Sequence, residues 1–278
     1  SGFKWRKAKV VLTSRDPKYR EKLDNIHEIL SHLRDDDRFF SIDEFGPFAV
    51  KAKGGKRLVA PDNYPSVPQR QRSKGCLIIT AALELSRNQV THFYSAKKNT
   101  EEMVKLLHLL LEQCKGCRTL YFSWDAASWH ASKLLYKTVE EVNSVQYRKD
   151  NGTPFVALAP LPASAQFLNV IESVFSGMAK AIIHNSDYES LEMAIVAINR
   201  YFADRNALFN QHPKRAGKKF GGKRLHLPCS TKHRTAKTHF GLVQDDDLGE
   251  RYRHSRSNSD CPSQPKSKLS RLRGLEGF

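Results

Sequence analysis

Residues 119–125 read Thr-Leu-Tyr-Phe-Ser-Trp-Asp, a run of strand-forming residues that ends in a carboxylate. A second run, residues 39–45 (Phe-Phe-Ser-Ile-Asp-Glu-Phe), carries Asp43 near its end. A third acid, Glu172, borders the broad apolar face of a helix predicted over residues 165–184. A carboxylate among apolar neighbours is costly unless its charge is compensated. A pair of divalent metal ions would compensate these charges and would also catalyse phosphodiester chemistry.

The elements around these acids predict an α/β fold in which helices pack on a mixed sheet. Gly46-Pro47 separates residues 39–45 from a hairpin partner. Strands are expected over residues 39–45, 48–53, 76–85, 90–95, 119–124 and 154–158, and helices over 17–33, 100–114, 132–142, 165–184 and 187–209. If strands 39–45 and 119–124 are neighbours, Asp43 and Asp125 point into one cleft near the strand carboxyl ends.

Three acids from three elements suit a magnesium site. Mg²⁺ binds a few carboxylates together with waters and phosphate oxygens, so Asp43, Asp125 and Glu172 leave coordination positions open. Two ions about 4 Å apart can activate an attacking oxygen and stabilise the leaving oxygen. The structural alternative is that Asp43 begins a turn, Asp125 caps a helix and Glu172 is a charge at a helix edge.

Composition favours a nucleic-acid partner and gives no sign of a membrane segment. The 278 residues carry a formal charge of +17, which fits a polyanionic ligand. The charge is uneven, because residues 213–278 hold 16 Lys and Arg against six Asp and Glu. No apolar run approaches the roughly 20 residues that span a bilayer. Five cysteines without a disulfide-scaffold spacing suit a reducing compartment, and we expect a cytoplasmic protein.

Three short motifs, taken in order, resemble those of the DDE transposases, and more narrowly the bacterial insertion-sequence branch related to mariner-like elements. They are Ile-Asp-Glu-Phe-Gly-Pro at 42–47, Ser-Trp-Asp-Ala-Ala-Ser-Trp-His-Ala-Ser at 123–132 and Leu-Asn-Val-Ile-Glu-Ser-Val-Phe-Ser-Gly-Met at 168–178. The resemblance covers roughly residues 3–219. It implies a ribonuclease-H-like fold, an α/β mixed five-stranded sheet flanked by helices.

The resemblance also implies a reaction and its partners. Asp43, Asp125 and Glu172 would form the metal-binding catalytic triad and hold two Mg²⁺ (or Mn²⁺) ions. Enzymes of this family cut double-stranded DNA at transposon ends and join the freed 3′-hydroxyl to target DNA. A dimer on DNA is expected, in the bacterial cytoplasm and associated with the nucleoid.

Four further residues match the family motifs and have roles that the sequence leaves open. Glu44 follows the first aspartate and would point to the opposite strand face, where it could support the site. Trp129 and His130 follow the second aspartate, and a contact with DNA competes with simple packing. Asn169, one helical turn before Glu172, could steady a phosphate or the carboxylate, or be a surface residue near a helix start.

The chain divides into a basic linker and helix (1–38), a catalytic domain (39–212) and a basic tail (213–278). Within the linker, Lys4, Trp5, Arg6 and Lys7 could track a phosphate backbone. No helix-turn-helix module fits in residues 1–38, so we expect weak DNA binding with little sequence preference. The tail lacks periodicity and should be disordered, as a frameshifted or fused end or as a basic DNA-coating arm.

Three functions remain open at this stage. The first is a DNA-cutting and strand-transferring enzyme. The second is a catalytically idle DNA-binding remnant of a decaying mobile element. The third is a structure-selective nuclease of the same fold, which would cut branched or RNA–DNA substrates without joining ends.

Overall fold

The computed structural model describes residues 14–56 and 58–217. Lys4, Trp5, Arg6 and Lys7 lie outside these residues, as does the tail from residue 218 onward. In the described part of the chain, no helix is long and apolar enough to cross a membrane. Cys76, Cys114 and Cys117 are free thiols.

Among the described residues, five strands form one mixed sheet in the order β3-β2-β1-β4-β5. The strands are β1 (Asp37–Ala49), β2 (Cys76–Glu84), β3 (Gln89–Ser95), β4 (Thr119–Ser123) and β5 (Phe155–Leu158). The pairs β1–β2 and β2–β3 are antiparallel, and the pairs β1–β4 and β4–β5 are parallel. The predicted mixed five-stranded sheet is therefore confirmed.

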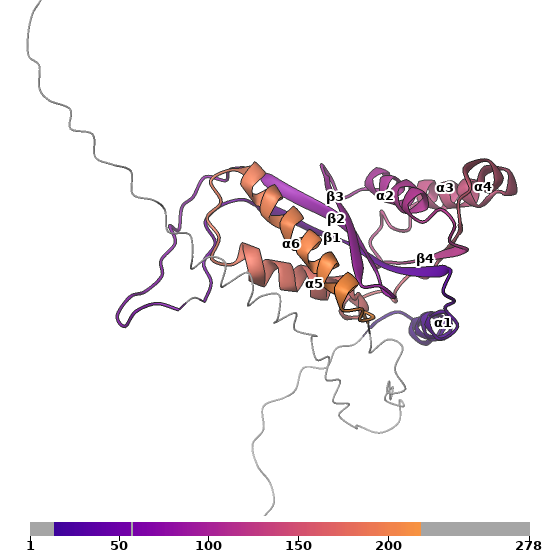
Figure 1. Cartoon of the computed structure of the whole chain (residues 1–278), viewed down its shortest axis with the longest axis horizontal. Helices are drawn as coiled ribbons and strands as arrows, with labels where there is room; N and C mark the ends of the chain where they lie inside the picture. The colour runs from indigo at the N-terminus through magenta and orange to yellow at the C-terminus, as the bar shows by residue number, and fades with distance from the viewer. Residues whose placement is uncertain (1–13, 57, 218–278) are drawn as a thin grey trace, which may run out of the picture.

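Helices cover both faces of this sheet (Figure 1). They are α1 (Tyr19–Ser31), α2 (Thr100–Gln113), α3 (Lys133–Asn143), α4 (Val145–Asn151), the 3₁₀ turn η1 (Gln166–Leu168), α5 (Ile171–Met178), the π-helical turn η2 (Ala179–Ile183) and α6 (Leu191–Gln211). In Figure 1, α2, α3 and α4 lie on one side of the sheet, and α5 and α6 lie on the other.

Alternate residues of the strands build two separate cores. Phe39 of β1 and Ile79 of β2 pack with side chains from α1, α5 and α6. Phe40 and Ile42 of β1 pack on the other face with Phe122 of β4 and with side chains from α2 and α3. This period of two is what the pleat of a strand requires. It places neighbouring residues of β1, including Asp43 and Glu44, on opposite faces of the sheet.

The predicted hairpin at Gly46-Pro47 is wrong, because the chain continues as one strand through both residues. Phe45 pairs with Ile79 and Phe48 pairs with Leu77, so three steps along β1 match two steps along β2. One extra residue in one strand is a β-bulge. The segments before and after Gly46-Pro47 both pair with β2, so these two residues form a bulge and not a turn.

The single long helix predicted over residues 165–184 is also wrong. The chain forms η1, then α5 from Ile171, then the π-helical η2. Asn169 lies between η1 and α5 with an extended ψ of 107°. Contacts between this segment and β1, described below, account for the break.

Candidate active site at the ends of two parallel strands

The parallel pairing of β1 and β4 brings two of the three acids together. The pairing runs from Asp37–Thr119 to Ser41–Ser123. Asp43 lies on β1 two residues beyond the last pair, and Asp125 follows the end of β4 two residues beyond the same pair. Both carboxylates therefore lie at the same edge of the sheet, as the sequence predicted.

Asp43 is the buried member of the acid group, with 8% of its surface exposed. Its carboxylate accepts hydrogen bonds from the backbone amide of Glu44 at 2.8 Å and from Asn169 Nδ2 at 2.9 Å. Burial and the nearby carboxylates of Glu172 and Asp125 raise the pKa of Asp43 to about 8, although the Glu44 amide opposes this. Glu172, exposed in the first turn of α5, is thus close enough to act on Asp43 electrostatically.

Asn169 is buried and fastens α5 to β1, which the sequence did not foresee. Its Nδ2 also donates to the Ile42 carbonyl at 3.1 Å, and its Oδ1 accepts from the Ser41 hydroxyl. Ser41 Oγ in turn accepts from the Ile171 amide at 3.1 Å, the start of α5. A free amide at a helix start needs such a partner. The prediction that Asn169 lies on a helical turn is wrong, since these bonds pull it out of the helix.

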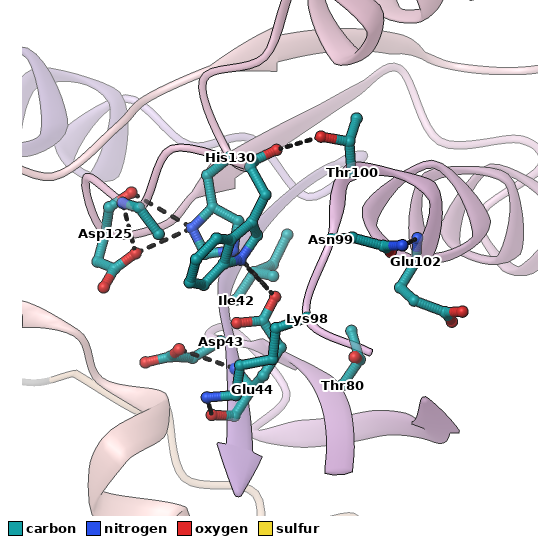
Figure 2. Close-up of polar contacts among 12 residues, drawn as sticks. Ile42, Asp43, Glu44, Thr80, Lys98, Asn99, Thr100, Glu102, Asp125 and His130 are labelled. Atoms are coloured by element: carbon teal, nitrogen blue, oxygen red, sulfur yellow. Dashed lines mark hydrogen bonds and ion pairs between the residues drawn. The ribbon is translucent and has the colours of Figure 1, made fainter. Parts of the chain in front are cut away.

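His130 bridges two carboxylates across the edge of the sheet (Figure 2). Its Nδ1 lies 2.9 Å from Asp125 Oδ1, and its Nε2 lies 3.1 Å from Glu44 Oε1. Both ring nitrogens face carboxylate oxygens, so both donate and the ring is a charged imidazolium. Burial alone would lower the pKa of His130, but the hydrogen bonds to Asp125 and Glu44 outweigh it and raise the pKa to about 9.

Glu44 completes this bridge from the face of β1 opposite to Asp43. Its Oε1 also accepts from Trp129 Nε1 at 3.1 Å. The side chains of Glu44 and His130 are only 2% and 1% exposed, so the ion pair is desolvated. His130 lowers the pKa of Asp125 by hydrogen bonding, against the effect of burial. Glu44, Trp129 and His130 therefore form one hydrogen-bonded group, and this group orients the carboxylate of Asp125.

The donor set fits a divalent metal, although the acids do not form a closed cage. Residues 14–56 and 58–217 contain no group of three or more His, Cys, Asp or Glu side chains arranged to hold an ion. Glu172 nonetheless lies close enough to Asp43 to raise its pKa. A bound cation would relieve the repulsion between such crowded carboxylates. Oxygen donors with open positions are what Mg²⁺ and Mn²⁺ take.

Two residues of the site, Ser41 and Lys98, were not predicted from the sequence. Lys98 Nζ donates to the Glu44 carbonyl at 3.1 Å, and its charge also lowers the pKa of Asp125. A polar residue two positions before Asp43 on the same strand face was the available hint for Ser41.

Comparisons with known proteins agree with this architecture. The Mos1 transposase paired-end complex with the left transposon end matches 73% of this chain and 60% of its own, at 17% identity and a TM-score of 0.50. The Mos1 mariner paired-end complex with Mn matches 91% and 66%, at 17% identity and a TM-score of 0.52. The chain thus spans about two thirds of these proteins or less. The likeness confirms the ribonuclease-H-like fold.

The comparison with curated proteins gave no match. The sequence model of one family, however, matches residues 38–194, more than half of the chain. That segment contains every residue of the site described above. The chain belongs to the DDE superfamily endonucleases.

Proposed function

We propose that this chain is the catalytic part of a DNA transposase, with Asp43, Asp125 and Glu172 as its metal-binding triad. The observation that carries the proposal is the meeting of three acids from β1, β4 and α5 at one sheet edge, close enough to raise the pKa of Asp43. Membership of the endonuclease family supports DNA as the substrate. The fold-related Mos1 structures hold a transposon end in one case and Mn in another.

Two of the three carboxylates are held by hydrogen bonds within the chain. Asn169 and the Glu44 amide orient Asp43, and His130 holds Oδ1 of Asp125, which leaves Oδ2 for a ligand. Glu172 is exposed and projects from the first turn of α5. Two Mg²⁺ or Mn²⁺ ions bound by these acids would activate the attacking oxygen and stabilise the leaving oxygen.

Glu44, Trp129 and His130 act as positioning residues in this proposal. Partners of a ligating carboxylate commonly set its orientation and basicity. The Glu44–His130 pair fixes one oxygen of Asp125 from the opposite sheet face. Trp129 restrains Glu44 through its indole N–H. None of the three needs to touch DNA for this role.

The wider setting is part of the same proposal. Double-stranded DNA, both transposon ends and target, would be the partner, and a dimer would form on it. Lys4, Trp5, Arg6 and Lys7 would add phosphate contacts. The reaction would take place in the bacterial cytoplasm at the nucleoid, where the DNA substrate is found.

The test is strand nicking and joining of a short duplex with Mn²⁺ or Mg²⁺. Asp125→Asn keeps an Oδ1 acceptor for His130 but removes the charge, and Asp150→Asn, an exposed aspartate on α4, is the matched control. Metal-dependent cleavage by the wild type and Asp150→Asn, lost in Asp125→Asn and Glu172→Gln, is expected. Cleavage that survives Asp125→Asn would refute the carboxylate mechanism.

Product analysis separates the other functions. Joined products support a transposase, whereas cutting of branched or RNA–DNA substrates without joining would indicate a structure-selective nuclease. DNA binding without any metal-dependent cutting would indicate an idle remnant.

A further inference from the structure

Lys98 reaches the gap that opens where β4 ends. The Phe39 carbonyl accepts from the Leu85 amide at 2.9 Å, so odd-numbered residues of β1 bond toward β2 and even-numbered residues bond toward β4. The Glu44 carbonyl therefore points to the β4 side, beyond the last β1–β4 pair at Ser41–Ser123. The Lys98 ammonium occupies this place at 3.1 Å from the carbonyl (Figure 2).

This ammonium forms no ion pair within the described part of the chain. Its bond to the Glu44 carbonyl is the one hydrogen bond that the described residues give it. An ammonium has three N–H donors, so two remain for solvent or a ligand. Its charge nevertheless acts on Asp125, which places it beside the catalytic edge.

The loop that carries Lys98 is held on both sides. Asn99 caps the start of α2, accepting from the Glu102 amide at 3.1 Å. The Thr100 hydroxyl donates to the Trp129 carbonyl at 3.2 Å, which joins this loop to the segment that carries His130. Lys98 itself is half-buried. A lysine anchored in this way presents its charge at a defined position and loses little entropy on binding.

We propose that Lys98 binds a DNA phosphate next to the cleaved bond. This inference rests on the proposed function of the site. The acids Asp43, Asp125 and Glu172 repel a phosphodiester, and metal ions bound among them would attract only the reacting phosphate. A fixed lysine beside them holds a neighbouring phosphate as a point charge and so sets the register of the strand.

The role of Lys98 is tested better by the rate of DNA cleavage than by DNA affinity. Residues 213–278 alone contain 16 Lys and Arg, and their contacts would mask one phosphate contact in a binding curve. Single-turnover cleavage of a duplex with Mn²⁺ reports only productively placed strands. We expect Lys98→Ala to lose about tenfold in rate, since a hydrogen bond to a charged group is removed. Lys98→Arg should retain most of the rate.

Lys115→Ala is the matched control, because Lys115 pairs with the exposed Glu112 near the far end of α2. It should cleave within twofold of wild type. Thermal unfolding of each variant shows whether the fold survives. A Lys98→Ala variant that cleaves like Lys115→Ala would overturn the proposal.

Neutral phosphate analogues in the DNA show which phosphate Lys98 contacts. Methylphosphonates are placed one at a time within three nucleotides of the mapped cut. At one position the methylphosphonate should slow cleavage by the wild type about tenfold. It should cause no further loss of rate in Lys98→Ala, because in a double-mutant cycle two interacting groups show non-additive effects. Additive losses at every position would show that Lys98 only supports Glu44, and would overturn the inference. A wild type that cuts no DNA would instead refute the proposed function, and this inference with it.

Discussion

Removing His130 should expose how much the buried charge bridge contributes to folding. In His130→Ala, the Glu44 carboxylate stays buried with the Trp129 indole as its remaining side-chain partner. Truncating one partner of a buried ion pair typically costs about 3–5 kcal/mol. We therefore expect the free energy of unfolding to fall by about that amount near pH 6.

The pH dependence gives an independent estimate of the same quantity. The folded pKa of His130 is about 9, against about 6.5 for an unfolded histidine. A shift of about 2.5 units corresponds to about 3 kcal/mol. Because the folded pKa is the higher one, this stability is fully present below about pH 6.5 and is lost as the pH rises through 9.

The assay is urea unfolding of wild type and His130→Ala in EDTA at pH 6 and pH 9.5. The difference in the free energy of unfolding between wild type and His130→Ala should be about 3 kcal/mol smaller at pH 9.5 than at pH 6. His108→Ala, which removes an exposed histidine from α2, should show no such change. A gap below about 1 kcal/mol at pH 6, or one that does not change with pH, would refute the charged bridge.

Three further predictions follow from the same contacts. Asn169→Ala removes the amide that holds Asp43, so cleavage should fall at least tenfold and urea unfolding should show a loss of about 1–3 kcal/mol; unchanged cleavage would contradict the orienting role. Arg118→Ala leaves Asp37, 1% exposed, without the guanidinium that bonds it at 2.6 Å, and a lower urea midpoint of unfolding is expected. Burial alone would raise the pKa of Asp37, but the hydrogen bonds from Arg118, the Arg34 amide and Thr119, together with the Arg118 charge, outweigh burial and lower the pKa. The stabilisation from the charged Asp37 is therefore present above an unfolded aspartate's pKa and is lost in acid, so the difference in unfolding free energy between wild type and variant should narrow below about pH 4. Mn²⁺ at about 100 times its Kd should stabilise the wild type by about 2.7 kcal/mol in thermal unfolding but not Asp125→Asn, and an equal rise in both Tm values would place the metal elsewhere.

The sequence alone predicted the class of the fold, which is confirmed, and proposed three acids for the site. Runs of strand-forming residues identified β2, β3 and β4, and helical periodicity identified α1, α2 and α6 to within a few residues. Asp43 and Asp125 lay near the ends of two predicted strands and would meet only if those strands were neighbours, which the β1–β4 pairing provides. These features depend on local pattern, which a single sequence displays directly.

Tertiary structure decided how the site is held. The β-bulge at Gly46-Pro47 depends on pairing with β2, and the break before α5 depends on hydrogen bonds between Asn169 and β1, more than 120 residues away. The same holds for the bridge from Glu44 to His130, 86 positions apart, and for the reach of Lys98 into the gap beyond β4. A hydrogen bond between distant residues leaves no periodicity in the sequence, because its partners become neighbours only after the sheet has formed.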